Sequence, residues 1–346
     1  MPRASAISRT ADTDDETRAD PVAPEHRRPS MLHAINTIGA RGAVVLVWFA
    51  LIVGYGLREP DLFLTTGTFQ TIFGSQQALV FLSVALLCTI CVGEFVDLSV
   101  ASIFGLVAVA TTVLTVEHGW NVWLASAAAV ALGTACGAVN GLLVVRLGVN
   151  VIVVTLGMGT FLLGGALWMT DLLPVGGLDP AFGRIALQPV GGLPVSFYEG
   201  LALVLGFAYV LHLTPLGRNM RFVAANREVS RLAGVRVERV RFGAFVAAGA
   251  ICGLGGVLAA ASTGGFDPSV SQSYLLPTFA ATFLGTAVLL PGRFNPMGTW
   301  IAIYFLATGI LGLQLMGVAG WVSSVFYGGV LIVAVTISTV LHSRSA

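Results

Sequence analysis

The sequence predicts an all-α integral membrane protein with about ten transmembrane helices, and three observations support this fold class. Hydrophobic residues make up 56% of the 346 residues and charged residues only 10%, whereas about one quarter of a soluble domain is charged. Apolar runs recur at close to the length, about 20 residues, that crosses a bilayer as a helix. These runs are rich in Leu, Val, Ala and Gly without strict alternation, so helices rather than barrel strands satisfy the backbone in lipid.

Residues 1–41 are predicted to be a disordered cytoplasmic tail. Most of this segment mixes acids and arginines with Pro21, Pro24 and Pro29 and has little to bury. The first apolar run begins only near Gly42, too far from the start for a secretory signal peptide. We therefore expect the tail to stay on the cytoplasmic side.

The transmembrane domain is predicted to cover residues 42–342. With the N-terminus inside, only Arg58 and Arg184 of the 18 arginines fall outside. Because arginine-rich segments stay on the cytoplasmic side, this asymmetry predicts that both termini are cytoplasmic. The expected spans are 42–57, 71–92, 98–116, 121–145, 150–172, 196–213, 242–262, 274–290, 297–316 and 320–341.

The longest outside segment, residues 173–195, is rich in proline and glycine. It is expected to be either a plain connector or a docking rim for an extracytoplasmic partner. All four cysteines lie inside apolar runs, where we interpret them as small packing residues. Gly133, Gly137 and Gly141, like Gly249 and Gly253, are spaced by four, which predicts close helix packing within one subunit.

A basic island at residues 214–241 reads TPLGRNMRFVAANREVSRLAGVRVERVR and holds seven of the 18 arginines. The charge of this island alone predicts that it lies on the cytoplasmic side of the membrane. The order of residues predicts more: a short helix from Asn226 to Ala233, capped by Asn226 and ended by Gly234.

The side chains of this short helix suit a docking element. Arg227 and Arg231 lie four apart, on one face, and could meet carboxylates. Val229 and Leu232 could fill an apolar groove. Glu228 belongs to the same candidate set, and a generic positive loop is the alternative.

Two acids, Glu94 and Asp97, interrupt the apolar sequence where one expected span ends and the next begins. A charge at mid-bilayer costs about 2.5 to 3.5 kcal/mol, so such acids face a loop, a cavity or a partner. Asp97 is expected to cap the following helix. Gly93-Glu94-Phe95 resembles Gly292-Arg293-Phe294, which suggests related turns and a contact between Glu94 and Arg293.

Uncharged polar residues inside the spans offer a path for a polar solute. Thr278, Thr282 and Thr286 are spaced by four and are expected to share one helical face. Hydroxyls that bond back to their own helix are the alternative. The tentative translocation set consists of Glu94, Asp97, Asn140, Thr155, Thr278, Thr282, Thr286 and Gln314, while Gln76, Gln77, Ser83 and Thr160 are further polar residues of the spans.

No residue pattern predicts catalysis, a metal site or a cofactor. The five histidines have no metal-ligand spacing, and neither GxSxG nor HExxH occurs. The sequence has no lysine, and a Walker A loop needs one. ATP, if used, must therefore be bound by another subunit. The localised charge gives no reason to expect nucleic-acid binding.

Four segments together resemble the membrane subunits of bacterial ABC importers of the ribose and xylose type, relatives of branched-chain amino acid permeases. They are FVDLSVAS at 95–102, NVIVVTLGMGTFLLGGALWMT at 150–170, the basic island, and GRFNPMGTW at 292–300. The resemblance covers roughly residues 70–340. It implies a multi-pass protein of the bacterial cytoplasmic membrane whose basic island docks as a coupling helix on a cytoplasmic ATPase subunit.

The same resemblance implies two further partners, an extracytoplasmic solute-binding protein and a second permease, either a copy or a homologue. Val96, Ala101 and Ala225 depart from the family pattern, which leaves the solute open. We expect a monosaccharide; nucleosides and branched-chain amino acids are alternatives. A secondary transporter driven by an ion gradient through Glu94 and Asp97 is the rival from another class, and an intramembrane enzyme is a weaker one.

Overall fold

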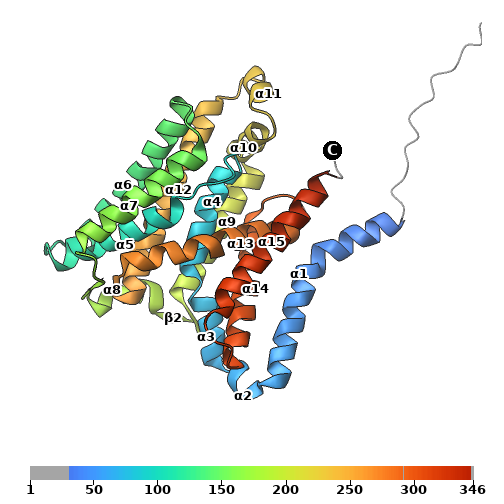
Figure 1. Ribbon diagram of the computed structural model, residues 1–346, viewed down its shortest axis with the longest axis horizontal. Helices are drawn as coiled ribbons and strands as arrows, with labels where there is room; N and C mark the ends of the chain where they lie inside the picture. Colours follow the sequence, from blue (N-terminus) through green and yellow to red (C-terminus); the bar gives the residue numbers. More distant parts are fainter. Residues whose placement is uncertain (1–30, 291, 344–346) are drawn as a thin grey trace, which may run out of the picture. The chain divides into compact units, whose positions relative to one another are not determined.

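The computed structural model describes residues 31–290 and 292–343, and this part of the chain is built mainly of helices (Figure 1). The described residues from Ile38 onward form one compact unit. The helices are α1 (Met31–Arg58), α2 (Pro60–Phe63), α3 (Thr66–Gly74), α4 (Gln77–Ile90), α5 (Val100–Val116), α6 (Val122–Gly141), α7 (Val151–Met169), α8 (Pro180–Leu187), α9 (Val195–Leu213), α10 (Pro215–Ala225), α11 (Arg227–Leu232), α12 (Val237–Thr263), α13 (Leu275–Leu284), α14 (Pro296–Leu315) and α15 (Val322–Ser343).

Short elements complete the fold. A π-helical turn, η1 (Leu142–Arg146), extends α6, and two 3₁₀ turns, η2 (Pro268–Tyr274) and η3 (Gly285–Ala287), flank α13. Within the described residues, four two-residue strands form two antiparallel pairs: β1 (Val175–Gly176) with β4 (Gly265–Phe266), and β2 (Pro189–Val190) with β3 (Leu193–Pro194).

Six segments among the described residues are long and apolar enough to cross a membrane. Three shorter apolar helices, Val44–Arg58, Val100–Val116 and Val322–Thr336, coincide with further expected spans. Residues 31–41, placed in the tail by sequence, belong to α1, and the rest of that tail lies outside the described residues. The six long segments are Thr66–Ile90, Val122–Arg146, Val151–Met169, Val195–Leu213, Val237–Thr263 and Pro296–Leu315.

The expected span at 274–290 is not one continuous helix. Helix α13 ends at Leu284 and is only about 15 Å long at 1.5 Å per residue, half of a bilayer core. Figure 1 shows its orange ribbon running across its neighbours rather than along them. The helix can stop here because the buried Asn295 donates from Nδ2 to the carbonyls of Gly285, at 3.2 Å, and Val288, at 3.3 Å, groups that an interrupted helix leaves without partners.

Helices α6 and α12 cross at the spaced glycines, as the sequence predicts. A Cβ atom added to Gly137 would lie 3.0 Å from the Cα of Gly249, and one added to Gly253 would lie 3.1 Å from the Cα of Val130. Without side chains in the way, the two backbones approach closely and gain van der Waals contact that lipid does not supply.

We expect Gly249→Leu to lower the thermal unfolding midpoint of the purified protein, because overpacking a tight contact costs about 1 to 3 kcal/mol. Gly243→Leu is the matched control, since Gly243 lies on the same helix and a Cβ there meets no atom within 4 Å. Thermal shift in detergent micelles measures both variants. Equal midpoints for the two would contradict the packing role of Gly249.

The long segment after α7 has structure of its own. Strand β1 pairs with β4 beyond the end of α12, and Asp179 caps α8 by accepting a hydrogen bond from the Ala181 backbone N–H at 2.7 Å. Residues 173–195 are therefore an ordered connection, tied at β1 to a distant part of the chain.

Candidate functional site

The short helix predicted within the basic island is present as α11. The Asn226 side-chain oxygen accepts hydrogen bonds from the backbone N–H groups of Glu228 at 3.0 Å and Val229 at 3.1 Å. Gly234 has φ +82°, and its N–H donates to the Arg231 carbonyl at 3.0 Å. The hydrogen bonds to Asn226 confirm the predicted cap. The left-handed backbone at Gly234, a conformation that favours glycine after a helix, confirms the predicted helix end. Figure 1 shows α11 at the opposite end of the helices from α2 and α3.

Helix α11 turns apolar side chains outward. Val229 is 61% exposed and Leu232 is 82% exposed. Arg231 lies beside them and pairs with Glu228 at 3.0 Å and with Glu238 at 3.6 Å. The helix thus offers a small apolar surface with a charged border, the arrangement found at protein interfaces.

The buried acid Glu94 joins three elements at this end. It is only 4% exposed, and its Oε1 lies 2.8 Å from Arg227 Nη2 of α11 and 2.6 Å from the Arg241 guanidinium of α12. The predicted contact of Glu94 with Arg293 is therefore wrong: Glu94 takes its partners from the basic island. Arg227, which the sequence suggested could meet a carboxylate, pairs with Glu94 of the same chain.

The two similar turns nevertheless meet. The rings of Phe95 and Phe294 lie 6.2 Å apart between centroids, and Gly93 and Gly292 both have positive φ, +85° and +75°. The motif pairs these turns through their aromatic rings rather than through opposite charges.

Asp97 begins a buried hydrogen-bond chain. Its Oδ1 accepts from the Ser99 backbone N–H at 3.0 Å and from the Ser99 hydroxyl at 2.7 Å, and the Ser99 oxygen accepts from Asn140 Nδ2 at 2.8 Å. Asp97 therefore orders the turn before α5, close to its expected capping role. It also connects α5 to α6 through Asn140.

The buried threonines of the translocation set are not among the residues that line the cavity beside Gln314. Thr155, Thr278 and Thr286 each donate to a carbonyl three or four residues earlier, at 2.7 to 2.8 Å, which is the predicted alternative. Thr286 belongs to η3 and not to α13, so the three spaced threonines do not share one continuous helical face. The buried Thr282 hydroxyl has no partner among the described residues.

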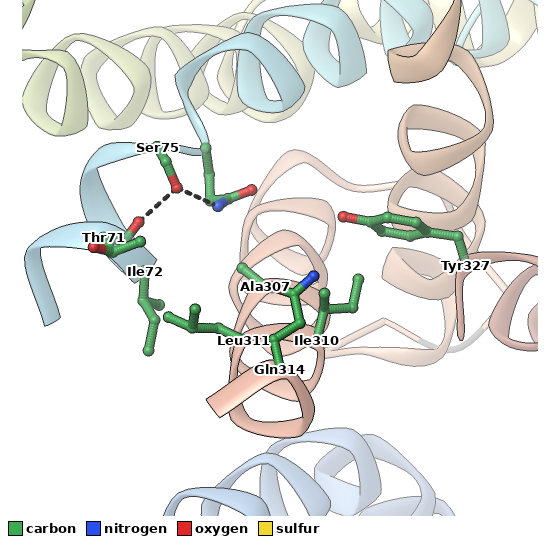
Figure 2. Close-up of a pocket in the computed structure, with 9 residues that line it drawn as sticks. Thr71, Ile72, Ser75, Ala307, Ile310, Leu311, Gln314 and Tyr327 are labelled. Carbon is green, nitrogen blue, oxygen red and sulfur yellow. Dashed lines mark hydrogen bonds between the residues drawn. The ribbon is translucent and has the colours of Figure 1, made fainter. Parts of the chain in front are cut away.

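Gln314 does line a cavity, of about 160 Å³. Figure 2 shows that its walls come from three places in the chain. Gln76, one of the polar residues of the spans, is part of it. The lining residues are Thr71, Ile72, Ser75 and Gln76 around the break between α3 and α4, Ala307, Ile310, Leu311 and Gln314 of α14, and Tyr327 of α15.

Sequence reasoning missed Arg241, Tyr327 and Glu199. Arg241 looked like one more charge of a basic loop. Tyr327 becomes a cavity residue only when α15 packs beside α14. Glu199 lies inside α9, and its Oε2 is buried without a partner in the described part of the chain. Glu199 could have been recognised from the sequence because it is an acid within an apolar run.

The described residues contain no group of three His, Cys, Asp or Glu side chains that could hold a metal ion. All four cysteines are buried and free.

A family model described as a branched-chain amino acid transport system permease component matches residues 68–335. The chain is 29% identical to the L-arabinose ABC transporter permease protein AraH of Azospirillum brasilense, over 97% of this chain and 96% of that protein. It is 32% identical to the Autoinducer 2 import system permease protein LsrD of Escherichia coli strain K12, over 69% of this chain and 74% of LsrD. No solved structure matches the chain significantly.

Proposed function

The chain belongs to the permease-component family of the branched-chain amino acid transport system, and from this premise we propose that it is the membrane subunit of an ATP-binding-cassette importer whose solute is a monosaccharide. ATP is bound and hydrolysed by a separate cytoplasmic subunit, so this chain needs no cofactor of its own. An extracytoplasmic binding protein delivers the solute. A second permease, a copy or a homologue, completes the pathway.

The observation that carries the proposal is α11: a capped six-residue helix with Val229 and Leu232 turned to solvent. Exposed apolar residues bordered by charge fit the surface groove of a partner protein. The Glu94 contacts support a mechanical role, since a push on α11 reaches the turn before α5 through Arg227 and the start of α12 through Arg241.

In the proposed topology the chain crosses the bacterial cytoplasmic membrane about ten times, and both termini are cytoplasmic. Nine apolar helical segments of the described residues support nine of these passes. The tenth, at 274–290, is made by α13, η3 and the residues that follow, irregular backbone that is tolerated at membrane depth where protein surrounds it.

A monosaccharide is proposed as the solute because AraH, named for L-arabinose, matches over 97% of this chain. Branched-chain amino acids, from the family description, and nucleosides are the alternatives. An ion-coupled transporter has weaker support. Glu94 already faces two arginines, and Asp97 is held by Ser99, so neither acid is free to carry an ion along a path.

The test is purification of the protein with its native partners, followed by uptake of L-arabinose into proteoliposomes. We expect an ATPase subunit to copurify and uptake to require ATP inside the system. If no ATPase subunit copurifies, and uptake of the solute is insensitive to ATP depletion, the importer proposal fails. Uptake that follows an imposed ion gradient would favour the secondary transporter.

A further inference from the structure

The cavity is lined by residues of α3, α14 and α15, and Figure 1 shows α3 at the end of the helices opposite to α11. Gln314 is in the last turn of α14, and Ser75 is in the break between α3 and α4. The side chains of Thr71, Ser75 and Gln314 are exposed, so the cavity opens to the protein surface at that end. In the proposed topology this is the outer side.

The size of the cavity suits one small ring. Its volume of about 160 Å³ is close to the ~150 Å³ of an engineered protein cavity that holds benzene, a six-membered ring. A pentose in its ring form falls in this size class.

The polar groups of the cavity are available to a solute. The Tyr327 hydroxyl and the amide oxygens of Gln76 and Gln314 accept no hydrogen bond from any described residue. Figure 2 shows the Tyr327 hydroxyl and the Gln314 amide pointing toward the same space. Ile72, Ile310 and Leu311 add an apolar surface to the same cavity. A few convergent polar groups on a mainly apolar wall are typical of small-molecule sites.

No lining residue is charged. A carboxylate or an ammonium group that enters such a space loses its hydration without gaining an opposite charge, which is strongly unfavourable. An amino acid carries both groups, and a neutral solute with several hydroxyls carries neither.

We propose that this cavity receives the solute on the outer side of the permease, and that it takes neutral, polyhydroxylated molecules of pentose size while rejecting amino acids. The inference rests on the proposed import function and adds the place and the chemistry of solute entry. Gln314, Gln76 and Tyr327 are its hydrogen-bonding residues.

Cysteine labelling tests the cavity directly. The native cysteines are buried and are expected to react slowly, so a single Gln314→Cys variant in nanodiscs can be followed with a soluble maleimide. We expect millimolar L-arabinose to slow labelling at position 314 at least threefold and L-leucine to leave it unchanged. Gln70→Cys is the matched control, an exposed position of α3 outside the cavity, where neither solute should matter.

Kinetics give an independent readout. Tyr327→Phe removes only a hydroxyl, and loss of one hydrogen bond should raise the KM for L-arabinose uptake about three- to tenfold with little change in kcat. Tyr209→Phe is the control, because Tyr209 is exposed on α9 away from the cavity.

The outcomes separate this inference from the proposed function. ATP-driven uptake tests the proposed import function. Protection of the Gln314→Cys variant from the maleimide tests the proposed role of the cavity. ATP-driven uptake of L-arabinose without protection, or protection by L-leucine, would overturn the cavity assignment and leave the importer standing. Protection by L-arabinose alone supports the assignment even if the driving force proves to be different.

Discussion

Glu94→Ala is expected to reduce ATP-driven uptake at least tenfold while the protein still inserts into the membrane. The change leaves the Arg241 side chain, which is only 13% exposed, without the carboxylate 2.6 Å away. Breaking a buried ion pair by removing one partner costs about 3 to 5 kcal/mol, so the carboxylate links from the turn before α5 to α11 and to α12 are lost. ATP hydrolysis by the partner subunit should continue without matching transport. Proteoliposomes that report uptake and phosphate release together measure this uncoupling.

A double-mutant cycle distinguishes the two arginines of this cluster. Glu94→Gln combined with Arg241→Met should show strong coupling, because both groups are largely buried. The cycle with Arg227→Met should show weaker coupling, because the Arg227 side chain is 44% exposed and solvent screens its charge. Arg293→Met is the control, and coupling between Arg293 and Glu94 as large as that of Arg241 would contradict the structure.

Val229→Pro is expected to abolish coupling between ATP hydrolysis and uptake. Proline has no N–H to donate to the Asn226 side chain, which now accepts from Val229 at 3.1 Å, and a six-residue helix has few other bonds to hold it. Stimulation of the ATPase subunit by a solute-loaded binding protein should therefore be lost.

Val229→Ala serves as the backbone control for this variant. It keeps the N–H and the helix and removes only part of an exposed side chain, so we expect a several-fold weaker complex with normal coupling. A proline variant that transports as well as the alanine variant would remove α11 from the mechanism. Arg231→Glu tests whether coupling needs the positive charge of this helix. The substitution places a third acid beside Glu228 and Glu238, with which Arg231 now pairs.

Local sequence signals predicted α11 well. The cap, the charged short helix and Gly234 act over a few residues, so tertiary packing was not needed to recognise them. The glycines of α6 and α12 were equally informative, since glycines spaced by four let two helix backbones approach closely. Long apolar runs were found for the same reason: the bilayer fixes their length.

Partners distant in the chain could not be predicted. Glu94 meets Arg241 across 147 positions, and the sequence offered several arginines of equal plausibility. The break after α13 depends on Asn295 reaching back to Gly285 and Val288, which an apolar run cannot reveal. The cavity assembles from α3, α14 and α15, and its lining becomes recognisable only when these helices are packed together.

Helix α12 runs without interruption from Val237 to Thr263, about 40 Å at 1.5 Å per residue, so it is as long as a whole bilayer including its headgroups. Arg241 anchors its first turns to Glu94, and directly beyond its other end β4 pairs with β1. In the proposed mechanism, a small tilt of α11 would therefore be carried along α12 from its start to its far end, where the β1–β4 pairing connects it to residues 173–195.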